Sequence, residues 1–182
     1  MHKLYLAVTH SGTWFANGIS LFTNGAEYSH AGISFSPTLN PLYSFGRKFT
    51  YLLLPSGFIT QGFGKHFYNH HPRGKLRVYL VTLTDAQYDL LNARLQPFID
   101  NTNSYKYGTL NIAYHYFGIP IHRLKHYTCI GFVAEMLNGI LPFNKDSSLV
   151  KPMDMCNFDL PLLYEGSFKN FNSINLLEAE YD

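Results

Sequence analysis

Two short segments far apart in the chain carry the residue types of thiol chemistry. Segment 127–136 has the sequence Tyr-Thr-Cys-Ile-Gly-Phe-Val-Ala-Glu-Met and places Cys129 in the first turn of an expected amphipathic helix. Unpaired backbone N–H groups and the helix dipole favour a thiolate there, so the pKa of Cys129 is expected below its ordinary value of about 8.5. Segment 28–35, Tyr-Ser-His-Ala-Gly-Ile-Ser-Phe, places His30 at the mouth of an expected buried strand. A cysteine nucleophile needs a base near it in space, so the pair predicts a Cys-His hydrolase or acyltransferase.

His30 precedes Cys129 in the chain, the reverse of the order in papain-like enzymes, and several other segments occur in a matching sequence. They are an opening strand and helix (4–9 and 14–22), the strand around His30, a following Leu-Tyr-Ser-Phe-Gly-Arg-Lys strand (42–48), the Cys129 helix, and the stretch 149–155. Together they resemble the circularly permuted papain-fold proteins of the NlpC type, which include YiiX-like and lecithin retinol acyltransferase-like enzymes. The resemblance implies an α+β, permuted papain-like fold with an antiparallel sheet packed against helices, forming one catalytic domain over residues 1–182.

The resemblance also implies a third catalytic residue. In these families a polar residue on the strand after the catalytic histidine orients the imidazole, and the alignment puts Ser44 at that position. A serine can accept the imidazole N–H bond but carries no charge, so it stabilises an imidazolium less than a carboxylate would. Either Ser44 fixes the tautomer of His30, or another group does so and Ser44 is an ordinary strand hydroxyl. The resemblance places Tyr28 and Thr9 near the site as substrate-binding candidates.

The substrate and even the activity have alternatives. NlpC-type relatives cleave peptides or cell-wall fragments, whereas lecithin retinol acyltransferase-like relatives handle lipid acyl groups; a peptidase or amidase is favoured, with a small-molecule, peptide or lipid substrate. Cys129 and His30 could instead be a small core residue and a structural histidine. The chain would then be a non-catalytic ligand-binding module that keeps the fold. Cys156 matches no motif and is expected to be structural.

Composition excludes several other classes. A net charge of +2 with scattered cations does not form the basic stripe of a nucleic-acid-binding protein. No apolar run reaches the length of a membrane span and the first residues lack a signal-peptide pattern, so a cytoplasmic location is expected.

His66 with His70, and His122 with His126, have helical i, i+4 spacing but lack the H-E-x-x-H pattern, so no metal and no cofactor are expected. The oligomeric state stays open.

Hydrophobic periodicity and capping residues predict the elements that must position these side chains. The 182 residues, 46% of them hydrophobic, suffice for one core. Thr84 and Gln87 form an expected capping box at the start of a helix. Segment 49–74 has no clear period and is expected to be a partly extended excursion. The predicted strands are 3–9, 29–36, 42–48 and 76–83, and the predicted helices begin at Trp14, Thr84, Tyr107, Cys129 and Pro152.

Overall fold

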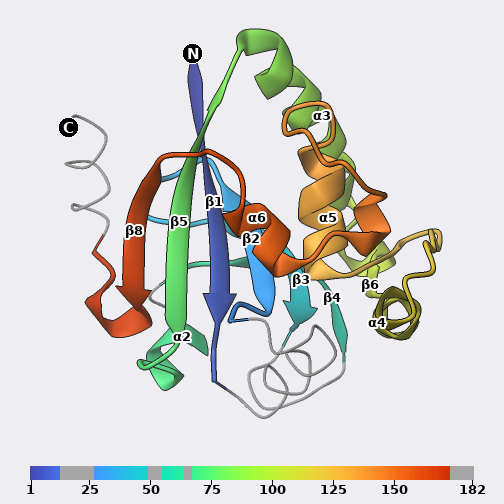
Figure 1. The fold of residues 1–182 in the computed structure, drawn as a ribbon, viewed down its shortest axis with the longest axis horizontal. Helices are drawn as coiled ribbons and strands as arrows, with labels where there is room; N and C mark the ends of the chain where they lie inside the picture. Colours follow the sequence, from blue (N-terminus) through green and yellow to red (C-terminus); the bar gives the residue numbers. More distant parts are fainter. Residues whose placement is uncertain (13–26, 49–54, 64–66, 173–182) are drawn as a thin grey trace.

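One eight-stranded sheet organises the computed structural model, which describes residues 1–12, 27–48, 55–63 and 67–172. The strand order is β7-β6-β4-β3-β2-β1-β5-β8 (Figure 1). All neighbouring strands are antiparallel except β6 and β7, which are parallel. The strands are β1 (His2–His10), β2 (His30–Ser34), β3 (Leu42–Arg47), β4 (Ser56–Gln61), β5 (Lys75–Leu83), β6 (Lys106–Tyr107), β7 (His126–Tyr127) and β8 (Leu162–Ser167).

The described helices follow the predicted capping chemistry. Thr84 caps α3, where its side chain accepts from the backbone N–H of Gln87 and the Gln87 side chain bonds back, so the predicted capping box is confirmed. Pro97 lies inside α3, and the helix continues to Asp100. The predicted helix at Trp14 lies outside the described residues. The helices are α2 (Phe67–His70), α3 (Asp85–Asp100), α4 (Thr109–Tyr116), α5 (Cys129–Met136) and α6 (Pro152–Cys156).

Strand β1 is buried on both faces, and its alternation separates two clusters of apolar side chains. Leu4, Leu6 and Val8 point into a cluster beneath α3 and α5, here called the helix-side cluster. Tyr5 and Ala7 point into a smaller cluster on the other face, here called the far-side cluster. Figure 1 shows α3 and α5 side by side against one part of the sheet. Position within a strand therefore decides which cluster a side chain joins.

Aromatic rings fill the space between α5 and the sheet. The ring centroid of Phe132 on α5 lies 5.3 Å from that of Phe45 and 5.6 Å from that of Phe58. Phe98 of α3 lies 5.2 Å from Phe132. These tilted and edge-to-face contacts stabilise the packing beyond what the buried area of the rings contributes. The packing fixes α5 against β2 and β3, and with it the position of Cys129.

The mixed α/β architecture agrees with the predicted α+β class. Four strands were not predicted. The strands β6 and β7 are only two residues long, and β6 occupies the position where a helix was expected to begin. The strand β4 falls inside the segment expected to lack a period, and β8 pairs with β5 at an edge of the sheet. Both β4 and β8 are six residues long and contain a glycine, so their apolar alternation is weak. None of the helices that the structure describes is long and apolar enough to cross a membrane.

Candidate active site

Cys129 is the first residue of α5, as predicted. The preceding residue, Thr128, is the N-cap, and its hydroxyl accepts a hydrogen bond of 3.0 Å from the backbone N–H of Gly131. The side chain of Cys129 points into the helix-side cluster and is 3% exposed. The sequence thus places a thiol at a helix start, and the packing of α5 buries it.

Burial raises the pKa of the Cys129 thiol above its ordinary value. Four groups act in the opposite direction and lower the pKa: the backbone amides of Ala31, Ile130 and Cys129 itself, and the phenol of Tyr107. The predicted lowering of the pKa of Cys129 is therefore wrong, because the cost of desolvating a thiolate exceeds the help of these donors. Tyr107 was missed by sequence reasoning, since it lies in a two-residue strand with no recognisable motif around it.

His30 and Ser44 lie together on neighbouring strands, as predicted. The Nε2 atom of His30 is 3.1 Å from the Oγ of Ser44, and the hydroxyl of Ser44 donates to the carbonyl oxygen of Ala31. A hydroxyl whose hydrogen is used in this way accepts from Nε2–H, which leaves the lone pair of the imidazole on Nδ1. Burial, and secondarily the charge of Arg47, lower the pKa of His30 to about 4, so the ring is neutral at pH 7.

The thiol and the imidazole are near each other along β2, but no direct hydrogen bond joins these two described side chains. Ala31 and Ile33 share the helix-side cluster with Cys129, so strand alternation directs the ring of His30 toward the other face. Its Cε1 lies 3.7 Å from the position that a Cβ on Gly46 would occupy. The structure brings His30 and Ser44 together and sets Cys129 against the next residue of β2, Ala31.

The two predicted substrate-binding residues have different surroundings. Thr9 on β1 is opposite His30 in the strand register and is 4% exposed. Tyr28 is 1% exposed and belongs to the helix-side cluster, with the guanidinium carbon of Arg77 5.1 Å from its ring centroid. Thr9 therefore borders His30, whereas the ring of Tyr28 is part of the core.

His122 and His126, which have helical spacing in the sequence, each have a different hydrogen-bond partner. His122 Nε2 is 2.9 Å from a carboxylate oxygen of Asp146, and His126 Nδ1 is 2.8 Å from the carbonyl oxygen of Leu124. His66 lies outside the described residues. Within the described part of the chain, no three His, Cys, Asp or Glu side chains are grouped as metal ligands would be.

Comparisons with known proteins add no family. No family model, no curated protein and no solved structure matches this chain. The resemblance to NlpC-type proteins and the predicted permuted papain-like arrangement stay predictions. The geometry around Cys129, His30 and Ser44 is therefore the basis for any proposed function.

Iodoacetamide is expected to label Cys156 faster than Cys129 in the folded protein. Cys129 is buried with a raised thiol pKa, whereas Cys156 is partly exposed. Peptide mass spectrometry after short exposure at neutral pH measures the two rates, and labelling in denaturant, where both thiols are free, supplies the control. Faster labelling of Cys129 in the folded protein would contradict the burial described above.

Proposed function

We propose that the chain is a cysteine hydrolase or acyltransferase, with a peptidase or amidase favoured, built on a permuted papain-like domain. Cys129 is the nucleophile, His30 the general base, and Ser44 the residue that orients His30. The observation that carries the proposal is the set of backbone amides near the sulfur of Cys129: its own, that of Ile130, and that of Ala31. Ala31 directly follows the neutral imidazole that Ser44 holds at Nε2. Such donors suit a thiolate and, after attack, a carbonyl oxyanion.

The proposed reaction follows acyl transfer through a thioester. The Nδ1 atom of His30 takes the proton of the Cys129 thiol, and the thiolate attacks the carbonyl carbon of an amide, ester or thioester. The oxyanion of the tetrahedral intermediate accepts hydrogen bonds from the backbone amides at the start of α5. His30 returns the proton to the leaving amine, alcohol or thiol. Water, or another acceptor, then attacks the acyl-enzyme and regenerates the thiol.

This reaction requires the imidazole to approach the thiol. The proposal therefore includes a local rearrangement at the start of β2 that brings Nδ1 of His30 to the thiol of Cys129 while Nε2 keeps its bond to Ser44. In the register of β2 and β3, Ile33 is paired with Tyr43. Ala31 is instead joined to β3 by the hydroxyl of Ser44, which donates to the carbonyl oxygen of Ala31. This single side-chain hydrogen bond can break more readily than a ladder of backbone hydrogen bonds. Thr9 lies beside His30 and is the residue proposed to contact substrate. Tyr28 is proposed to support the site from the core. The proposed location of the protein is the cytoplasm.

A second candidate function is a ligand-binding module without catalysis. The observation that favours it is the orientation of the His30 ring away from the face where Cys129 lies. A buried, protonated thiol and a partly buried, neutral imidazole that is bonded to Ser44 are both stable without any reaction. The two candidates differ in whether Cys129 can be acylated.

Acylation of Cys129 tests the proposal. After incubation with an amino acid p-nitroanilide, an amide that an unassisted thiol does not attack, intact-mass and peptide mass spectrometry are expected to find one acyl group on Cys129. Cys129→Ala is expected to remove the adduct and the release of nitroaniline, because the nucleophile is gone. Cys156→Ala is the matched control and is expected to keep both. Acylation of Cys156 alone, or of neither cysteine, would favour the binding module.

A further inference from the structure

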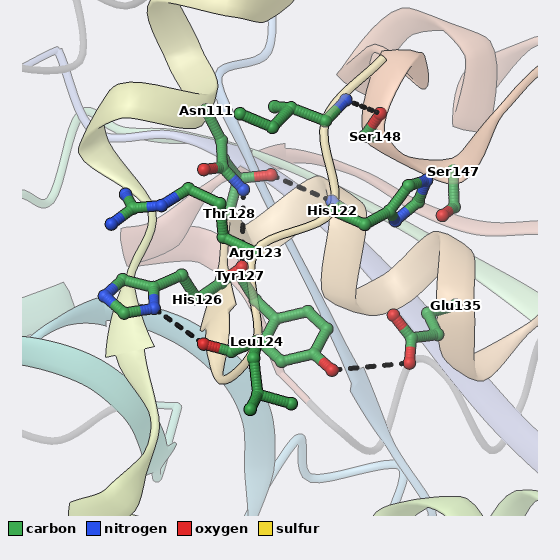
Figure 2. A pocket seen from close by; sticks show the side chains of 12 residues that line it. Asn111, His122, Arg123, Leu124, His126, Tyr127, Thr128, Glu135, Ser147 and Ser148 are labelled. Atoms are coloured by element: carbon green, nitrogen blue, oxygen red, sulfur yellow. Dashed lines mark hydrogen bonds between the residues drawn. The ribbon is translucent and has the colours of Figure 1, made fainter.

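A polar cavity lies on the outward side of α5, away from the buried thiol. Its volume is about 380 Å³, which lies in the size range of pockets for small ligands. Gly131 and Glu135 of α5 line it, whereas Cys129 and Phe132 of the same helix point into the core. Figure 2 shows the wall formed by α4, the 121–128 segment and α5. The lining residues are Asn111, Ile121, His122, Arg123, Leu124, His126, Tyr127, Thr128, Gly131, Glu135, Ser147 and Ser148.

One wall of this cavity carries a carboxylate that lacks a cationic partner. Glu135 is partly buried, and its side chain has one hydrogen bond, from the hydroxyl of Tyr127 at a long 3.5 Å. No Lys, Arg or His within the described ranges forms an ion pair with it. Burial raises the pKa of Glu135 above its ordinary value, while His122 and Arg94 act in the opposite direction. A partly desolvated carboxylate of this kind is stabilised by a cation that brings its own N–H donors.

A second acceptor in the wall is unused. Asn111 is 7% exposed, and its Nδ2 donates to the carbonyl oxygen of His126 at 3.3 Å. Its Oδ1 is buried and has no hydrogen-bond partner among the residues that the structure describes. A buried acceptor without a partner destabilises the free protein, and a ligand N–H that reaches it would remove that penalty. Glu135 and Asn111 are therefore two separate acceptor-bearing residues in the lining of the same cavity.

The described basic residues of the lining do not form an ion pair with Glu135. His122, whose charge acts on the Glu135 carboxylate, is bonded through Nε2 to a carboxylate oxygen of Asp146 at 2.9 Å. Figure 2 shows the guanidinium of Arg123 at the opposite end of the group from Glu135. A ligand that spans this distance meets acceptors at one end and a positive charge at the other.

We propose that this cavity binds a free dipeptide, with the ammonium group of the dipeptide on Glu135 and its carboxylate toward Arg123. The N–H groups of the ligand satisfy Glu135 and the Oδ1 of Asn111, and the ring of Tyr127 lies beside the ammonium group. This site does not depend on the proposed chemistry of Cys129, because it uses the other side of α5.

Calorimetric titration with the dipeptide L-alanyl-L-alanine tests the site. Saturable binding to the unaltered protein is expected, with N-acetyl-alanyl-alanine, which lacks the ammonium group, binding at least about tenfold more weakly. Glu135→Gln keeps the shape of the side chain but removes its charge. This substitution is expected to weaken the binding of the dipeptide to a similar degree. Asp89→Asn, the same charge change at an exposed position of α3, is expected to leave the affinity unchanged.

Two results would overturn the proposal. One is the absence of saturable binding of the dipeptide to the unaltered protein, and the other is equal binding of the free and the acetylated dipeptide. The ligand comparison uses the unaltered chain, so it stands even if Glu135→Gln fails to fold. Binding measured with Cys129→Ala, in which acylation is lost, separates this site from the proposed catalytic one: affinity there is expected to equal that of the unaltered chain.

Discussion

Replacing Phe132 with alanine is expected to lower the free energy of unfolding by about 3–5 kcal/mol, the usual cost of removing a buried phenylalanine ring. Phe132 is 0% exposed and contacts Phe45, Phe58 and Phe98, which belong to two strands and to α3. The cavity left behind cannot be filled by a single neighbour, because these rings are held by different elements. Chemical denaturation followed by circular dichroism measures the change as a lower midpoint at an unchanged slope.

A matched substitution separates core packing from helix effects. Leu110 on α4 is 56% exposed, so Leu110→Ala is expected to change the free energy of unfolding by no more than about 0.5 kcal/mol. If Phe132→Ala costs as little as Leu110→Ala, the aromatic packing does not hold α5 against the sheet. The position of Cys129 would then need another explanation.

Replacing His30 with alanine is expected to slow acylation of Cys129 by about 10²–10⁴-fold, the range for loss of a general base. Ser44→Ala is expected to slow it only about tenfold, because one orienting hydrogen bond is lost and the base remains. Acyl-enzyme formation followed by rapid quenching and mass spectrometry measures both rates. Equal rates for the unaltered protein and His30→Ala would exclude His30 as the base.

The pH dependence of stability gives a separate test of the surroundings of His30. Burial lowers the pKa of His30 to about 4 in the folded chain, below its value of about 6.5 in an unfolded one. The unfolded state therefore binds more protons between these values. The contribution of His30 to stability is complete above pH 6.5 and is lost as pH falls toward about 4. His30→Ala is expected to flatten this part of the curve; an unchanged slope would mean that the imidazole is not buried as described.

Local patterns in the sequence account for much of the fold. Alternation in residues 3–9 and 76–83 predicted β1 and β5, and Thr84 with Gln87 predicted the start of α3, because these signals depend on neighbours in the chain. The cap of α5 is equally local but was not predicted: Thr128 and Gly131 are three residues apart and bond directly. Strand β4 escaped prediction because Gly57 interrupts its alternation.

The candidate site could be predicted in part. The pairing of His30 with Ser44 followed from the resemblance to NlpC-type proteins, which implies a polar residue on the strand after the histidine. The orientation of His30 relative to Cys129 depends on which face of the sheet α5 covers, and no local pattern contains that information. The raised pKa of Cys129 could not be predicted either, because burial is a property of the assembled core. The contact between Cys129 and Tyr107 also forms only in the assembled core.

The long ladder between β1 and β5 has a consequence for the order of events as the chain emerges from a ribosome. Nine residue pairs connect the two strands, from His2 opposite Leu83 to His10 opposite Lys75. Strand β1 is made before β5, so it waits for a neighbour some seventy positions later before this edge is covered. Until then its unpaired edge and both apolar faces are open to other chains, the condition in which a nascent strand benefits most from a chaperone.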